Sequence, residues 1–95
     1  MVLVWDENKN RINRRKHGVS FETGARIFED PNVVSYPDRI VDNEVRWHTI
    51  GCVGGIAILL VVHTSEEEQY GEENIRIISA RKASRRERAL YETHH

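Results

Sequence analysis

The chain has 95 residues, a formal net charge of -1, 39% hydrophobic residues and 31% charged residues. This length predicts one domain over residues 1–95, and the composition excludes a fully disordered chain. No apolar run approaches the roughly 20 residues that span a bilayer, and a single cysteine excludes an internal disulfide. With no secretory signal recognisable at the N-terminus, these features predict a cytoplasmic protein without a membrane partner.

The start of the chain predicts a short strand and then a polar helix. Residues 2–5 are β-prone. Asp6 suits the N-cap position of a helix that runs to about His17, and Gly18 suits the left-handed residue that follows a helix.

A second helix is predicted from its N-cap residue Ser20 to Asp30. Its apolar residues recur with helical spacing at Phe21, Ala25 and Phe28. The helix should end at Asp30 because a residue that precedes a proline avoids the helical region.

The remainder of the chain predicts several strands and a final helix. Strands are expected at residues 33–36, 44–53, 56–64 and 75–81, with the acidic segment 65–74 as a mobile hairpin loop. Ser84 and Glu87 match a capping box that begins a helix through about Glu92. The expected fold class is α+β. It has a short first strand, two N-terminal helices, a twisted and mostly antiparallel sheet of four to five strands, and a C-terminal helix, with the helices packed on one side.

Charge is segregated along the chain. Residues 9–16 carry five cations and no acid, and residues 81–88 carry five cations and one acid. Between Glu22 and Glu73, eleven acids accompany three arginines. The two basic blocks form one polyanion-binding face if the fold brings them together. Alternatively, each block is the solvated side of a surface helix.

The first predicted helix carries a candidate phosphate-binding face. Lys9, Asn13 and Lys16 recur at helical spacing, with His17 beside them. Two ammonium groups and an amide are suited to neutralising and orienting a phosphodiester backbone. An ordinary solvated helix would show the same pattern, and His17 alone would suit a helix C-terminus.

The central strands carry arginine and histidine. Arg46 and His48 alternate with Trp47, so the first two side chains should face the same way. His63 lies at the end of the long apolar strand. It is either a general acid or base or a core histidine whose hydrogen bonds are satisfied.

The next strand carries two further arginines. Strict strand alternation places Arg81 and Ser79 on one face and Arg76 on the other. An arginine within a strand needs a carboxylate, a carbonyl or a phosphate as its partner.

No metal or nucleotide cofactor is indicated. Cys52 and the isolated residues His17, His48 and His63 lack a ligand spacing, and no acidic pair or glycine-rich phosphate-binding motif stands out. The terminal His94 and His95 resemble the end of a purification tag and are set aside. Any phosphodiester cleavage should therefore be metal-independent.

Taken together, these segments resemble the BrnT family of toxins. The N-terminal part of the resemblance is WDENK at residues 5–9, Asn13, KHG at residues 16–18 and Ser20-Phe21. The later part is Arg46-Trp47, Ile50-Gly51, VHT at residues 62–64 and IRIISARKA at residues 75–83, followed by Arg85, Glu87 and Tyr91. Two features depart from the family pattern: Thr23-Gly24, where helix-favouring residues are usual, and the acidic loop 65–73.

The resemblance implies a type II toxin with a RelE-like fold that cleaves RNA and inhibits translation. It also implies a cognate BrnA-type antitoxin. This partner would bind the toxin in a hetero-oligomer, cover its active face and supply the contact with operator DNA.

A metal-independent ribonuclease of this kind activates the RNA 2′-hydroxyl to attack the adjacent phosphate. We expect Arg46 and Arg81 to stabilise the transition-state charge and His63 or His17 to carry the proton, with Lys9 beside them. The residues expected to bind RNA are Asn13, Lys16, Lys82, Arg85 and Arg86. Two other classes stay open: a non-catalytic nucleic-acid-binding module and a protein-interaction module, each using the same basic face.

Overall fold

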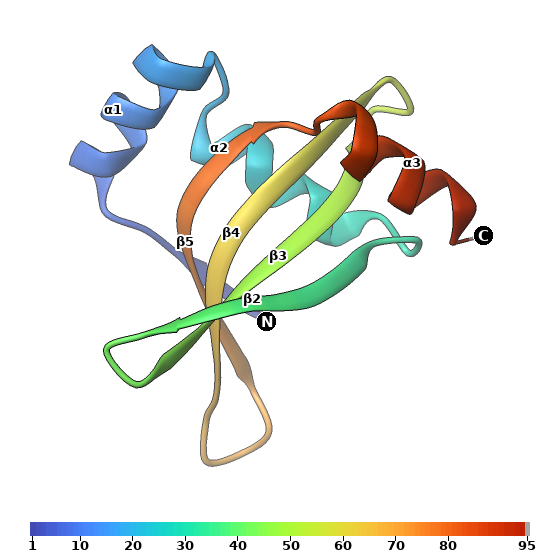
Figure 1. Ribbon diagram of the computed structural model, residues 1–95. Coiled ribbons are helices and arrows are strands. Elements are labelled where there is room, and N and C mark those ends of the chain that lie inside the picture. Colours follow the sequence, from blue (N-terminus) through green and yellow to red (C-terminus); the bar gives the residue numbers. More distant parts are fainter. Residues whose placement is uncertain (95) are drawn as a thin grey trace.

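The computed structural model describes residues 1–94, which form an α+β fold with a five-stranded sheet (Figure 1). The strands are β1 (Val2–Val4), β2 (Val34–Val41), β3 (Glu44–Val53), β4 (Ala57–Glu67) and β5 (Glu73–Lys82). The helices are α1 (Glu7–His17), α2 (Phe21–Ala25) and α3 (Arg85–Thr93), and a 3-10 helix, η1 (Arg26–Glu29), follows α2 directly. Among the described residues, no helix is long and apolar enough to cross a membrane.

The sheet has the strand order β1-β5-β4-β3-β2. Strands β2 to β5 pair antiparallel with their neighbours in sequence, whereas β1 pairs parallel with β5. The sheet is therefore mixed but mostly antiparallel, as predicted.

Helices cover both faces of this sheet, so the prediction that they pack on one side is wrong. Leu59 and Val61 of β4 belong to a cluster with Phe21 and Ile27, on the face we call the back face. Leu60 points the other way, towards Tyr91 of α3, on the front face. Figure 1 shows α2 behind the strands and α3 in front of them. The reason lies in β4, because a strand that is apolar on both faces must be covered on both.

The predicted caps of α1 and α3 are confirmed. The carboxylate of Asp6 accepts hydrogen bonds from the backbone N–H groups of Asn8 and Lys9, and Gly18 is left-handed with φ 73°. The capping box of Ser84 and Glu87 is present in full. These local interactions fix where both helices begin.

The α1 helix lies along the part of β5 that extends beyond β1. The amide of Asn13 donates to the carbonyl of Ala80 (2.8 Å) and accepts from the N–H of the same residue (3.2 Å). Its second N–H donates to the carbonyl of Val19 (2.9 Å). Asn13 thus satisfies an open strand edge in the way that a neighbouring strand would.

Close packing explains why a glycine occupies position 24 within a helix, which the sequence alone did not reveal. A Cβ atom at this position would lie 2.9 Å from the Cβ of Ala80 and 3.3 Å from a methyl group of Val61. The absence of a side chain therefore lets α2 lie directly against the sheet. This contact offsets the usual cost of about 1 kcal/mol for glycine within a helix.

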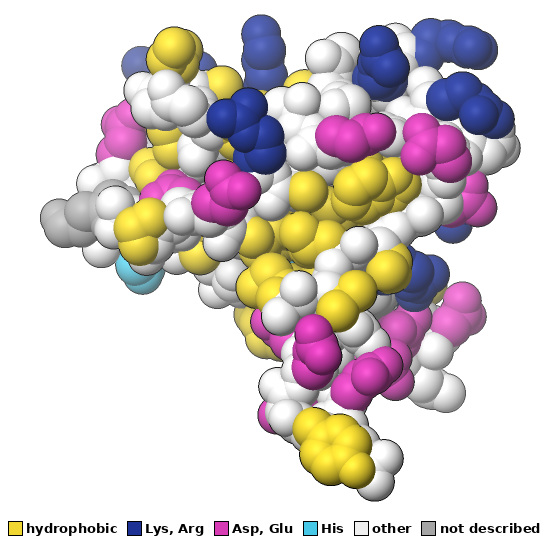
Figure 2. Space-filling model, turned by 180° about the vertical axis from the view of Figure 1, so that it is seen from behind, with side chains coloured by type: hydrophobic (Ala, Val, Ile, Leu, Met, Phe, Trp, Pro, Cys, Tyr) yellow, Lys and Arg dark blue, Asp and Glu magenta, His cyan; other side chains and the backbone are white. Residues whose placement is uncertain are grey.

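Three predicted strand boundaries are wrong: the end of β2, the end of β4 and the start of β5. Strand β2 runs to Val41 rather than stopping at Tyr36, because β2 is an edge strand, where Pro37 is tolerated, and its register shifts between Pro37 and Arg39. Segment 65–74 is also not a loop throughout, since β4 continues to Glu67 and β5 begins at Glu73. The acidic hairpin projects away from the rest of the molecule, as Figures 1 and 2 show.

Candidate active site

The front face carries a row of polar side chains beside α3. Strand pairing aligns Ser79 of β5 with Val62 of β4, Val62 with His48 of β3, and His48 with Tyr36 of β2. The preceding row, which contains Arg81, Leu60 and Ile50, lies about 7 Å away along the strands. Leu60 and Ile50 pack in the cluster that contains Tyr91 of α3. The polar row therefore begins where the cover of α3 ends.

Arg81 forms a two-pronged salt bridge with Glu87 of α3. Its Nη1 and Nη2 atoms donate to the two carboxylate oxygens at 2.8 and 3.0 Å. Hydrogen bonds from Arg81, together with the backbone N–H of Ser84, lower the pKa of Glu87 to about 2. The same partner raises the pKa of Arg81. An arginine held in this geometry can offer two parallel N–H groups to a phosphate once the carboxylate gives way.

This pair predicts an acid-dependent stability. The folded state lowers the pKa of Glu87 from 4.5 to about 2. The pair's contribution is therefore complete above about pH 4.5 and is lost as the pH falls towards 2. We expect Glu87→Gln to reduce the free energy of unfolding at pH 7 by about 1–2 kcal/mol, because solvent screens part of the interaction.

Urea unfolding between pH 7 and pH 3 measures this effect. The difference between parent and Glu87→Gln should shrink as the pH falls. Glu92→Gln, which removes an exposed carboxylate from the same helix, is the control. An undiminished difference at pH 3 would contradict this account of the pair.

Tyr36, His48 and Asp38 form a hydrogen-bonded and charged chain beside this salt bridge. The hydroxyl of Tyr36 lies 3.2 Å from Nδ1 of His48, and Nε2 of His48 lies 3.4 Å from a carboxylate oxygen of Asp38. Burial, and then the charges of Glu87 and Asp38, raise the pKa of Tyr36, so its phenol is protonated at neutral pH. The Asp38 carboxylate can only accept a hydrogen bond, which favours the imidazole N–H on Nε2; in that tautomer Nδ1 can accept a hydrogen bond from the Tyr36 hydroxyl.

Arg46 lies further along the same face of β3 than His48. One oxygen of Glu44 accepts a hydrogen bond from Arg76 (2.7 Å) and lies 3.5 Å from Nη1 of Arg46. That Nη1 atom is buried and makes no hydrogen bond to the described residues. Arg46 is therefore a cation whose hydrogen-bonding capacity is only partly used.

Arg76 is on the front face with Arg81, and the prediction from strict alternation is wrong. Val62 pairs with Ser79, whereas the next residue, His63, pairs with Ile77. This shift inserts one residue into β5 and reverses the alternation beyond it.

His63 lies on the back face, away from Arg46 and Arg81. It is 4% exposed, and Phe28 contacts its ring edge-on with 5.3 Å between ring centroids. Nδ1 lies 3.0 Å from the carbonyl of Thr64, and Nε2 lies 2.7 Å from the hydroxyl of Thr49. Burial lowers the pKa of His63. The catalytic prediction for His63 is therefore corrected: it is a neutral core histidine with both nitrogens satisfied, which the sequence left as the alternative.

Asn13 is also corrected, from an RNA contact to a structural residue. Only 7% of it is exposed, and both amide hydrogens are bonded to backbone carbonyls. Its neighbours on α1 differ, because Lys9 and Lys16 are exposed. Together with His17, they line a shallow depression that Ser79 borders. The α1 cations therefore lie next to one end of the polar row.

The cations after Arg81 are split by α3 rather than forming one strip. Lys82 and Arg85 line a groove on one side of the helix. Arg86 lines a separate depression with Tyr36 and Glu87 on the other side. The cations of the C-terminal block therefore lie on two sides of α3 and do not all share one surface.

Sequence reasoning missed three residues of this site. Tyr36 is the last residue of the strand predicted at residues 33–36, and Asp38 lies beyond that strand. Glu87 was read only as a helix cap. The one available signal was the alternation of Arg46 and His48, which identified the correct face of β3.

The described residues include no group of three or more histidine, cysteine, aspartate or glutamate side chains that could hold a metal ion. The front face presents guanidinium groups and a phenol–imidazole pair. This combination is typical of proteins that bind and process phosphate esters.

Comparison with known proteins identifies the class. The family model for the ribonuclease toxin BrnT of type II toxin–antitoxin systems matches residues 5–87. The chain therefore belongs to the BrnT family of ribonuclease toxins, and this membership implies an RNA substrate and an antitoxin partner.

A solved structure supports the same conclusion. The 1.1 Å crystal structure of the Brucella abortus ribonuclease toxin BrnT is 27% identical in sequence, with a TM-score of 0.66. The match covers 90% of this chain and all of the Brucella chain. A comparison with curated proteins gave no significant match.

Proposed function

We propose that this toxin cleaves RNA without a metal ion, by attack of a 2′-hydroxyl on the adjacent phosphate, and thereby inhibits translation in the cytoplasm. One observation carries the proposal: Arg46, Arg81, His48 and Tyr36 share the front face beside α3. The two arginines supply positive charge, and the tyrosine–histidine pair supplies a route for a proton. These are the groups that cleavage by a 2′-hydroxyl requires.

The proposed reaction moves one proton from the nucleophile to the leaving group. The 2′-hydroxyl gives its proton to the Tyr36–His48 pair as the bond from O2′ to phosphorus forms. The bond from phosphorus to O5′ then breaks, and the pair returns a proton to O5′. Because the Tyr36 hydroxyl and His48 Nδ1 are 3.2 Å apart, the two groups can share that proton during the cycle. The products are a 2′,3′-cyclic phosphate and a free 5′-hydroxyl.

The remaining predicted site residues, including the catalytic candidates Lys9 and His17, are assigned to positioning of the RNA. Lys9, Lys16 and His17 would hold the RNA backbone where it leaves the polar row beside Ser79. Arg86 would do so on the Tyr36 side of α3. Lys82 and Arg85, which are also predicted to bind RNA, lie apart from this path, in a groove on the other side of the helix.

The partner part of the proposal follows the family. A BrnA-type antitoxin would form a hetero-oligomer with this chain, neutralise it and supply the only contact with operator DNA. The RelE-like character of the fold stays a prediction from the sequence resemblance.

His48→Asn tests the proposed chemistry. Removal of a positioned proton-transfer group should slow RNA cleavage by roughly 100- to 10,000-fold. Stability should change little, since His48 is only partly buried. The matched variant His63→Asn should chiefly lower the free energy of unfolding, because it disturbs a buried network. Single-turnover cleavage of a labelled RNA and urea unfolding of both variants measure the contrast.

Product analysis decides between this reaction and the alternatives. Cleavage should persist in EDTA and leave 5′-hydroxyl ends. Ends that carry a 5′-phosphate, or loss of activity in EDTA, would contradict the proposed reaction. Binding of RNA without any shortening would identify a non-catalytic RNA-binding module instead.

A further inference from the structure

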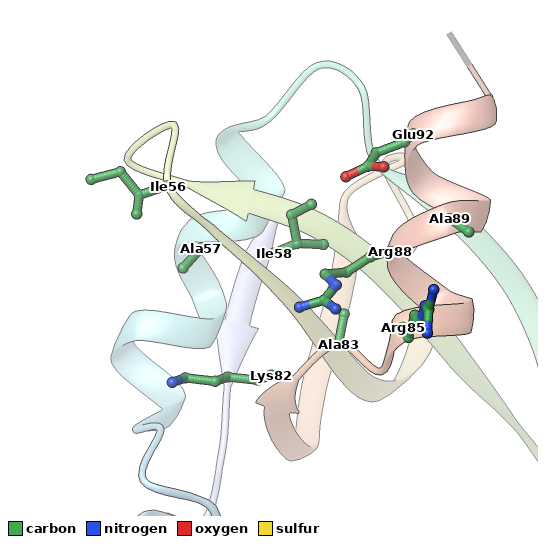
Figure 3. Close-up of a pocket in the computed structure, with 9 residues that line it drawn as sticks. All are labelled: Ile56, Ala57, Ile58, Lys82, Ala83, Arg85, Arg88, Ala89 and Glu92. Carbon is green, nitrogen blue, oxygen red and sulfur yellow. The ribbon is translucent and has the colours of Figure 1, made fainter.

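A groove separates α3 from the β3–β4 hairpin, on the side of the helix that faces away from Tyr36. Its volume is about 740 Å³. Its apolar lining comes from the hairpin, the end of β5 and one face of α3: Ile56, Ala57, Ile58, Ala83 and Ala89. Figure 3 shows Arg88 extending from α3 into the space between the helix and Ile58.

The apolar lining is unusually exposed at one point. Ile56 is 91% exposed and lies just after the turn formed by Gly54 and Gly55, which both have positive φ. A turn with two left-handed glycines holds the next residue in a defined direction. The side chain of Ile56 is therefore exposed to solvent beside the groove, and packing within the chain does not explain why this residue is apolar.

Three cations border this lining. Lys82, Arg85 and Arg88 line the groove with a single carboxylate, Glu92. The side chains of these three cations make no hydrogen bond or ion pair with residues 1–94. Arg81, which precedes Lys82 in β5, is by contrast paired with Glu87 through two hydrogen bonds. The groove thus combines aliphatic surface with positive charge that is free for a partner.

The chemistry of the groove favours a protein over RNA as its occupant. RNA-binding surfaces for unpaired bases use aromatic rings on which the bases stack. The groove has no aromatic lining residue, whereas the polar row on the other side of α3 has Tyr36. An exposed isoleucine beside other aliphatic side chains and unpaired arginines is instead suited to a surface that another protein covers.

We propose that this groove binds an acidic, amphipathic segment of a partner protein. Aliphatic side chains of the segment would cover Ile56 and Ile58, and its carboxylates would pair with Lys82, Arg85 and Arg88. Family membership implies one protein partner, the antitoxin, and the groove is where we expect a segment of it to lie. The inference rests on that partnership but not on the RNA-cleavage mechanism.

The position of the groove gives the contact a consequence. Lys82 directly follows Arg81, and Arg85 lies in the first turn of the helix that carries Glu87. A bound segment would therefore hold α3 against the sheet, with Glu87 on Arg81. It would also occupy two of the cations predicted to bind RNA. Binding in the groove and entry of RNA to the front face should therefore oppose one another.

The double variant Ile56→Asp/Arg88→Glu tests the groove. Both side chains lie outside the proposed catalytic and RNA-binding sets, and Ile56 is too exposed to contribute to the core. The probe is the antitoxin encoded with this toxin, titrated into the purified free toxin by calorimetry at low and high salt. We expect affinity to fall by at least about 30-fold, the effect of losing one interface hot spot. The salt dependence of binding should also become weaker.

The control Ile40→Asp/Arg11→Glu makes the same chemical changes at exposed positions away from the groove, and it should leave affinity within about threefold. An equal loss in both variants, or none in the groove variant, would overturn the proposal. RNA cleavage by the free groove variant should match the parent. A selective fall in cleavage would assign the groove to RNA and would likewise overturn it. If the parent itself fails to cleave RNA, the proposed function fails while the titration still decides the groove.

Discussion

Replacement of Arg81 by alanine should slow RNA cleavage by roughly 30- to 1,000-fold, or about 2–4 kcal/mol of transition-state stabilisation. The phosphorane that forms during 2′-hydroxyl attack carries more negative charge than the starting phosphodiester. The two N–H groups that now contact Glu87 at 2.8 and 3.0 Å would contact its oxygens instead. The interaction is therefore stronger in the transition state than in the ground state, which is the condition for catalysis.

Two further variants separate catalysis from folding. Arg81→Ala also removes the partner of Glu87, so cleavage is compared at equal folded fraction, checked by urea unfolding. Arg81→Lys keeps a charge but not the two-pronged geometry and should recover only part of the rate. Arg11→Ala removes an exposed cation that donates a hydrogen bond to Asn8 (3.0 Å), and it should cleave at close to the parental rate. A folded Arg81→Ala protein with the parental rate would remove Arg81 from the mechanism.

In the proposed mechanism, the carboxylate of Glu87 competes with an RNA phosphate for Arg81. Glu87 both closes the capping box of α3 and neutralises Arg81. A phosphate that reaches Arg81 must displace an anion whose pKa is lowered to about 2. In the proposed mechanism, the position of α3 would therefore set how readily the front face accepts RNA, and a partner that holds α3 would act on the same equilibrium.

The predictions that succeeded rest on short-range physics. Asp6, Gly18 and Ser84 were assigned as helix-terminal residues because a helix end needs groups that satisfy its first N–H donors or allow a left-handed turn. Those needs are met within three residues of the cap. The alternation of Arg46 and His48 is equally local. Such features can be predicted from sequence because no distant contact can easily override them.

The predictions that failed depend on contacts between distant segments. The face of the sheet on which α3 packs is set by Tyr91, which reaches Asp30 across the chain (2.5 Å). The face of Arg76 is set by an irregularity that appears only when β5 pairs with β4. Tyr36 and Asp38 join His48 through the register of β2, an edge strand with a bulge. The partners of the Tyr36–His48 and Tyr91–Asp30 contacts are 12 and 61 residues apart, so the pattern of neighbouring residues does not reveal them.

Polar residues were the hardest to assign, because the same side chain serves surface and interior. The spacing of Lys9, Asn13 and Lys16 predicted one shared function, yet the structure separates the amide from the two ammonium groups. An asparagine can satisfy backbone donors and acceptors together, so it can be buried where a lysine cannot. The helical spacing of a polar residue therefore indicates the face of the helix on which it lies, but not how deeply it is buried.

Asn13→Leu should lower the free energy of unfolding by about 3 kcal/mol, because it removes the partner of three backbone groups while filling a similar volume. Those groups are the N–H and carbonyl of Ala80 and the carbonyl of Val19. Loss of the amide also reopens the edge of β5 beside α1. Urea unfolding measures the change, and Asn8→Leu, at an exposed position of the same helix, should shift it by no more than about 0.5 kcal/mol. Asn13→Asp separates hydrogen bonding from packing, since a carboxylate of the same size accepts from Ala80 but cannot donate to either carbonyl. Asn13→Asp should therefore be destabilised as well, and parental stability in this variant would show that shape alone holds α1 on the sheet.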